Sequence, residues 1–97
     1  METKWSVAET EQKFVDAVLS VVGSRVTRGG ITRQTHLIND LSMSSIELLK
    51  LILACEREIG VSPVDNDDLA ETLSTVGRAV EALHQLRELK ARPRTGA

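Results

Sequence analysis

The 97-residue sequence has little of several residue types, and each shortage excludes a class of protein. Aromatic residues supply only 2% of the chain, as Trp5 and Phe14, so aliphatic side chains must fill the core. Strand-rich folds usually use more aromatic and β-branched residues, so the shortage favours helices. The single cysteine, Cys55, excludes an internal disulfide and a cysteine-based metal site.

Long hydrophobic runs are also missing. No apolar run approaches the roughly 20 residues that span a membrane, and the N-terminus lacks the basic-then-apolar pattern of a signal peptide. These absences predict a cytoplasmic protein without a membrane partner. The length fits one domain, which we assign to residues 1–90, followed by a flexible C-terminal tail over residues 91–97.

The net charge of −2 conceals an uneven distribution. Residues 45–75 contain seven acids and two bases, whereas residues 76–97 contain two acids and five bases. An acidic middle segment argues against nucleic acid as the main partner. It favours basic protein surfaces instead.

Capping signals and helical periodicity mark the first helix. Ser6 and Glu9 form an S-x-x-E capping box, apolar residues then recur at helical spacing, and Gly23 is the expected stop. These features predict a helix over residues 7–22.

The next segment, residues 24–39, has no sustained period and contains Gly29 and Gly30. Long connections in small domains are usually functional or packed by their own side chains. The expected anchors of this connection on the core are Ile31, Leu37 and Ile38.

A second capping box, Ser44 with Glu47, begins the next helix, which we expect to run from Ser45 to about Ile59 and to stop at Gly60. The expected core face comprises Leu48, Ile52, Cys55 and Ile59, with Leu49, Leu51 and Ala54 beside it. A second row contains Ile46, Lys50, Leu53 and Arg57. Its mixture of apolar and charged side chains is typical of a surface that docks a partner.

The remaining sequence predicts a short helix over about residues 66–71 and a longer one to about Leu89, capped by Ser74 or Thr75. Gly77 should weaken this last helix modestly. The resulting fold class is all-α: a bundle of three main helices and one short helix, with a long loop between the first two.

The turn before the second helix, D-L-S-M-S-S-I from Asp40 to Ile46, resembles the D-L-G-x-D-S-L motif of phosphopantetheine-dependent carrier proteins. The similarity extends over roughly residues 9–89. Membership would imply the acyl-carrier fold and a monomer that is not an enzyme. It would also imply 4′-phosphopantetheine, taken from coenzyme A by a phosphopantetheinyl transferase and attached to Ser45. The arm would hold acyl intermediates as thioesters for loading and downstream enzymes of polyketide, fatty-acid or related secondary-metabolite biosynthesis.

The sequence departs from this family pattern at several positions. Ser44 stands where acyl carriers usually have aspartate; serine caps a helix equally well, but one negative charge is lost. Ser42 stands where glycine is common. Lys50 and Arg57 interrupt a helix that is often strongly acidic, so we expect docking tuned to particular partners. The expected docking residues are Met43, Ser44, Ile46, Glu47, Lys50, Leu53 and Arg57.

Other functions compatible with the sequence are a stand-alone peptidyl carrier of nonribosomal peptide biosynthesis and an unmodified helical interaction module. A serine hydrolase would need a base for Ser45, and His36 is the only histidine close to the motif. His84 is expected at the surface or boundary of the last helix. Neither an acid partner nor a nucleophile elbow is evident.

Two further features have simple structural explanations. Cys55 falls on the expected core face, which favours a buried and inert thiol. The acids from Asp65 to Asp68 lack the full ligand spacing and terminal glutamate of a calcium loop, so we interpret them as the cap of a short helix.

Overall fold

The computed structural model of the chain describes residues 6–65 and 68–91. The described residues form the α-helices α1 (Val7–Val22), α2 (Ser45–Glu58), α3 (Leu69–Thr72) and α4 (Val76–Ala91). Short 3-10 helices η1 (Gly23–Arg25), η2 (Arg28–Gly30) and η3 (Pro63–Asp65) lie in the connections. This part of the chain contains no strand, and the predicted all-α fold is confirmed. None of its helices is long and apolar enough to cross a membrane.

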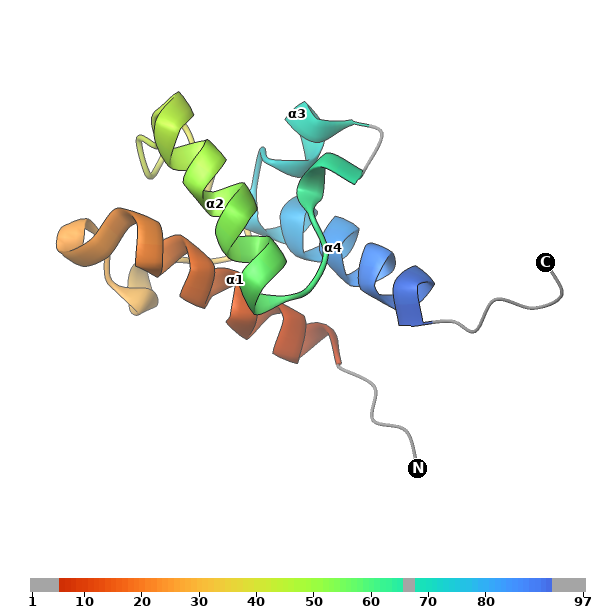
Figure 1. Cartoon of the computed structure of the whole chain (residues 1–97). Coiled ribbons are helices and arrows are strands. Elements are labelled where there is room, and N and C mark those ends of the chain that lie inside the picture. The colour runs from red at the N-terminus through yellow and green to blue at the C-terminus, as the bar shows by residue number, and fades with distance from the viewer. Residues whose placement is uncertain (1–5, 66–67, 92–97) are drawn as a thin grey trace, which may run out of the picture.

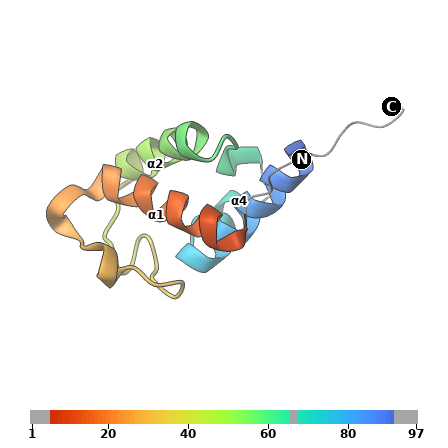
Figure 2. The same ribbon diagram turned by 90° about the horizontal axis from the view of Figure 1, so that it is seen from below.

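Helix α1 is the centre of the packing, because it contacts both α2 and α4, while α3 lies against α4. Figure 1 shows α1 and α2 side by side, and Figure 2 shows the same pair from below. In Figure 2 the connection between them, coloured orange to yellow, extends away from the pair. This arrangement places the start of α2 next to the end of the long connection.

The core is aliphatic, with Phe14 as its aromatic residue. Val76, Val80 and Leu83 of α4 are fully buried, as their spacing predicts. The buried face of α2 differs from the expected one. Its most buried members are Leu51, Ala54, Cys55 and Ile59, whereas Leu48 and Ile52 are only partly buried. The buried face is rotated about the helix axis relative to the expected one, because α1 is the main helix against which α2 packs.

The long connection is anchored on the core by three apolar residues, of which only two were expected. Leu37 and Leu41 are buried and Ile31 packs against the core, but Ile38 is 48% exposed, so its predicted role as an anchor is wrong. The amides of Asp40 and Leu41 both donate to the carbonyl of His36 at 2.9 and 3.2 Å. This turn directs Leu37 and Leu41 inward and leaves Ile38 outside.

The last two helices begin at polar caps. The side chain of Asp68 accepts a hydrogen bond from the Glu71 amide at the start of α3. This helix was expected from residue 66, and residues 66–67 lie outside the described residues. Thr75 Oγ1 accepts from the Arg78 amide at 3.2 Å, so Thr75 is the cap of α4. Residues 92–97 of the expected tail are also outside the described part, and Leu89 is 60% exposed.

Gly77 has a packing role that the sequence did not reveal. Its amide donates to the Arg33 carbonyl at 2.8 Å, and the Val76 amide donates to the Thr35 carbonyl at 2.9 Å. A Cβ atom at position 77 would lie 3.1 Å from the Arg33 carbonyl oxygen. Glycine therefore lets the connection approach the first turn of α4 closely.

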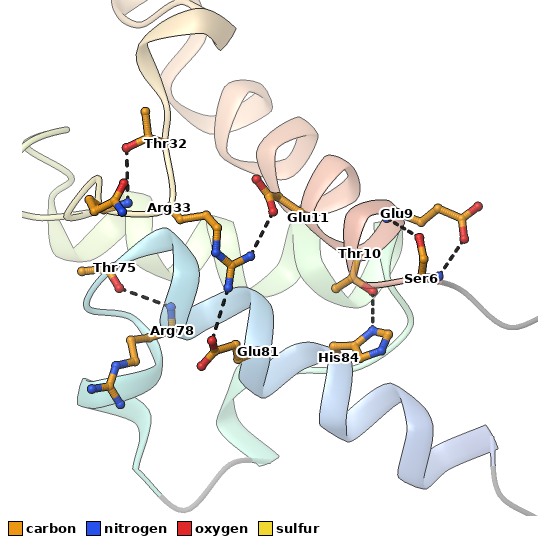
Figure 3. Close-up of polar contacts among 11 residues, drawn as sticks. Ser6, Glu9, Thr10, Glu11, Thr32, Arg33, Thr75, Arg78, Glu81 and His84 are labelled. Carbon is orange, nitrogen blue, oxygen red and sulfur yellow. Dashed lines mark hydrogen bonds and ion pairs between the residues drawn. The ribbon is translucent and has the colours of Figure 1, made fainter.

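Polar side chains reinforce this junction between α1, the connection and α4. Figure 3 shows the Arg33 guanidinium between the two helices, where it contacts Glu11 at 3.0 Å and Glu81 at 3.3 Å. In the same view the buried Thr10 hydroxyl lies 2.9 Å from Nδ1 of the half-buried His84. The connection is thus held by both backbone and side-chain contacts.

Ser42, directly before the start of α2, has a left-handed backbone conformation with φ of 55°. It is the one non-glycine residue with positive φ among those described. A Cβ atom makes this conformation unfavourable, and glycine removes that cost. The common occurrence of glycine at this position of the motif therefore has a backbone explanation.

We expect Ser42→Gly to raise the free energy of unfolding by up to about 1 kcal/mol, because glycine adopts this conformation without the Cβ clash. The gain is reduced by the larger backbone entropy that glycine loses on folding. Thermal unfolding followed by circular dichroism should show a Tm up to roughly 4–8 °C higher.

The matched control is Ser24→Gly, because Ser24 is exposed in η1 and has no positive φ. Glycine there relieves no clash and should leave the Tm unchanged or lower it. A Tm for Ser42→Gly below that of the wild type would contradict the conformational argument.

Candidate functional site at the start of helix α2

Helix α2 begins with a complete capping box. Ser44 has an extended backbone, and its hydroxyl accepts a hydrogen bond from the Glu47 amide at 3.2 Å. The Glu47 carboxylate in turn accepts one from the Ser44 amide at 3.1 Å. These two bonds, which the S-x-x-E pattern predicts, fix where the helix starts.

Arg25, at the end of η1, also binds the Glu47 carboxylate. Its Nη1 donates to Oε2 and its Nη2 to Oε1, both at 3.0 Å, and Nη2 also donates to the Leu41 carbonyl at 3.1 Å. The hydrogen bonds from Arg25 and from the Ser44 amide lower the pKa of Glu47, and the same carboxylate raises the pKa of Arg25. Arg25 and Glu47 are 22 residues apart in the sequence, so no local pattern indicates this pair.

Ser42, Ser44 and Ser45 are all exposed, but their surroundings differ. The Ser44 hydroxyl is engaged in capping, and Ser42 lies outside the helix. Ser45 is the first residue of α2, and its hydroxyl has no hydrogen-bond partner within the described chain. A group attached to this hydroxyl would lie at the positive end of the helix dipole, beside first-turn amides that lack intrahelical acceptors.

His36 does not assist Ser45. Its Nδ1 accepts hydrogen bonds from the amides of Ile38 and Asn39 at 3.2 and 3.1 Å, and its own amide donates to the Asp40 carboxylate at 2.7 Å. Over residues 6–65 and 68–91, His36 makes no hydrogen bond to Ser45. The imidazole organises the turn before the motif, and this geometry gives no support to a hydrolase.

Neither the Cys55 thiol nor the acidic run from Asp65 to Asp68 provides a reactive or metal-binding group among the described residues. Cys55 is fully buried, and burial raises the pKa of its thiol to about 12, so the thiol stays protonated. The described residues contain no cluster of His, Cys, Asp and Glu side chains that could hold a metal ion. Asp67, within the acidic run, lies outside them.

The outer surface of α2 contains a row of exposed apolar side chains. Ile46, Leu49 and Leu53 are 67%, 57% and 54% exposed, and we call these three residues the apolar row. Leu49 was expected beside the core. Lys50 and Arg57 of the expected docking set are exposed as well.

Met43 does not belong on this surface. It is 4% exposed, and its amide donates to the Leu37 carbonyl at 3.2 Å, which holds its backbone against the buried part of the connection. Its expected role as a docking residue is therefore corrected to a role in the core.

Comparison with known proteins finds similar chains over nearly their full length. The chain is 33% identical to the acyl carrier protein of Amoebophilus asiaticus (strain 5a2) over 79 residues, 81% of this chain and 94% of that protein. It is 34% identical to the acyl carrier protein of Lactobacillus johnsonii (strain CNCM I-12250 / La1 / NCC 533) over 74 residues, 74% of this chain and 90% of that protein. No family model and no solved structure matches the chain.

The ion pair at the start of α2 predicts a pH dependence. Because folding lowers the pKa of Glu47 below its ordinary value of 4.5, ionised Glu47 stabilises the folded state above pH 4.5. This stabilisation is lost as the pH falls through the lower, folded-state pKa. We expect Glu47→Gln to have a lower Tm than the wild type at pH 7, and the difference to shrink as the pH falls below 4.5.

Glu56→Gln provides the control, since Glu56 is exposed on the same helix and takes part in no ion pair within the described residues. Its Tm at pH 7 should differ less from that of the wild type. A Tm difference for Glu47→Gln that is constant from pH 7 to pH 3 would rule out a contribution from the Arg25 ion pair.

Proposed function

Because this chain belongs to the acyl carrier protein family, we propose that it carries acyl intermediates as thioesters on a 4′-phosphopantetheine arm attached to Ser45. The observation that carries this proposal is the free, exposed hydroxyl of Ser45 at the first position of α2. The position corresponds to the modified serine of the family motif. The acyl carrier proteins to which the chain is similar support the carrier role.

The surroundings of Ser45 fit such an attachment. A phosphodiester on its oxygen carries a negative charge, which the N-terminus of a helix favours through its dipole and free amides. In the capping box, the side chains of Ser44 and Glu47 each accept a hydrogen bond from the backbone amide of the other residue. Arg25 neutralises the Glu47 carboxylate. That carboxylate therefore repels a nearby phosphate less than an unpaired one would.

The protein's own part in the chemistry is limited to presentation. In the transfer, the Ser45 oxygen would lose its proton, form the new P–O bond and displace the nucleotide part of coenzyme A, while a separate transferase would hold the magnesium that this step uses. When attached, the arm would supply the thiol that forms the thioester. The chain itself contributes a rigid start of α2 and an exposed apolar row beside Ser45 that partner enzymes can contact.

As a single small domain in the cytoplasm, the protein would serve separate enzymes of polyketide, fatty-acid or related secondary-metabolite biosynthesis. Aminoacyl cargo is the alternative, because Ser44 and Lys50 depart from the acidic pattern common in acyl carriers. Loading the modified protein from a panel of acyl and aminoacyl donors, followed by intact mass, separates these classes of cargo.

The attachment site is tested by intact mass after incubation with coenzyme A and a promiscuous phosphopantetheinyl transferase. The wild type should gain the mass of one phosphopantetheine, and Ser45→Ala should gain none, because the accepting oxygen is absent. An unchanged mass of the wild type would contradict the carrier proposal.

The neighbouring serines supply the controls. Ser42→Ala should be modified like the wild type. Ser44→Ala should also be modified, although loss of the cap should lower its stability by about 1 kcal/mol. A mass gain that persists in Ser45→Ala but disappears in one of these variants would move the attachment site to that serine.

A further inference from the structure

A groove between α1 and α2 contains two cationic side chains. Its volume is about 270 Å³, and it is lined by Ser20, Val21, Lys50, Leu53, Ala54 and Arg57. The lining combines apolar side chains with two bases and contains no acid. Because Leu53 also belongs to the apolar row, the groove and the row form one continuous surface on α2.

Neither base of this groove is firmly paired. Lys50 has no ion pair in the described part of the chain, and its acidic neighbour Glu47 is already bound by Arg25 through both oxygens. Arg57 Nε lies 3.9 Å from the Glu58 carboxylate, and its side chain is 65% exposed. Exposed pairs of this kind contribute little and exchange readily, so both cations are available to a partner.

The two sides of the apolar row differ in charge. Lys50 and Arg57 are seven residues apart, about two helical turns, and both line the groove toward α1. Glu56 instead lines a separate cavity with Gly60 and Lys90, toward the end of α4. A partner that covers the row therefore meets two bases and no acid on the α1 side, whereas the cavity on the other side is lined by two acids and one base.

This local arrangement departs from the composition of the segment, which by itself favours basic partner surfaces. Residues 45–75 contain seven acids and two bases, yet both of those bases lie in the groove. Apart from the paired Glu47, the acids of this segment begin at Glu56. The first three turns of α2, residues 45–55, contain one base and the paired Glu47, so this surface is less acidic than the segment as a whole.

We propose that the groove and the apolar row receive an acidic segment of the enzyme to which the carrier docks. Partner carboxylates would lie beside Lys50 and Arg57, and partner apolar side chains would cover Ile46, Leu49 and Leu53. The proposal rests on the proposed function, because an enzyme that takes cargo from Ser45 must contact α2 near that residue. Complementary charges would accelerate the encounter and fix its orientation.

Two synthetic peptides test the sign of the partner charge on the unmodified protein. Each is a fluorescent amphipathic helix with one leucine face, flanked by glutamates in one peptide and by lysines in the other. Fluorescence anisotropy at low salt should show binding of the glutamate peptide, weakened by added salt. Amide shifts in NMR spectra should map this binding to Val21, Lys50 and Leu53.

Arg57→Glu and Arg78→Glu form a matched pair of variants. Both arginines are exposed, with side chains 65% and 61% accessible, and both substitutions change the net charge equally. Only Arg57 lines the groove. Arg57→Glu should weaken binding of the glutamate peptide by roughly three- to tenfold, while Arg78→Glu should change it less than about twofold. Lys50→Glu is the second groove variant, and circular dichroism verifies that each variant is folded.

Several results would overturn the proposal. These are equal or tighter binding of the lysine peptide, no binding of either peptide, or equal losses in Arg57→Glu and Arg78→Glu. Binding to anionic lipid vesicles without binding to the glutamate peptide would replace the enzyme with a membrane surface. The Ser45 mass test is independent, because the titration uses unmodified protein. If the protein binds the glutamate peptide but is never modified, the carrier function is refuted. The groove and the apolar row would still be a binding surface for acidic segments.

Discussion

The Glu47 carboxylate accepts hydrogen bonds from two directions, and the geometry around Ser45 depends on both. It caps the backbone of Ser44, and it binds the guanidinium of Arg25, which also reaches the Leu41 carbonyl. The end of η1, the end of the long connection and the start of α2 therefore meet at one charged group. A side chain attached directly after this junction has a defined position and direction, which a docking enzyme requires of a group presented to it.

The long connection is held at two places for different reasons. Near α2 the constraint is electrostatic, through Arg25. Near α4 it is a close backbone approach, in which Gly77 and Val76 donate to carbonyls of the connection, while Leu37 fills the core between these points. A segment with little regular structure can thus transmit the positions of α1 and α4 to the start of α2, because hydrogen bonds and burial replace the missing helix or strand.

Local signals in the sequence predicted where the main helices lie, but not which side of α2 is buried. The capping box at Ser44 and the stop at Gly60 predicted α2 to within one residue of its observed end. Periodicity shows that a helix has an apolar stripe, but the side that is buried depends on how α1 crosses it. For this reason Leu51 was more buried than expected and Leu49 less. The link between Arg25 and Glu47 depends on the tertiary fold, so no spacing rule could reveal it.

The buried thiol of Cys55 has a consequence for the chemistry that the protein would host. Thiolates attack thioesters, so an accessible cysteine on a thioester carrier could intercept the cargo or cross-link two copies of the chain. Cys55 is the single cysteine in the sequence, fully buried and held protonated by its raised pKa of about 12. Thiol-specific reagents should therefore not react with the folded polypeptide itself. Any thiol titrated on it under native conditions would report an attached arm without cargo, so such a titration would count the fraction of the protein whose arm is free.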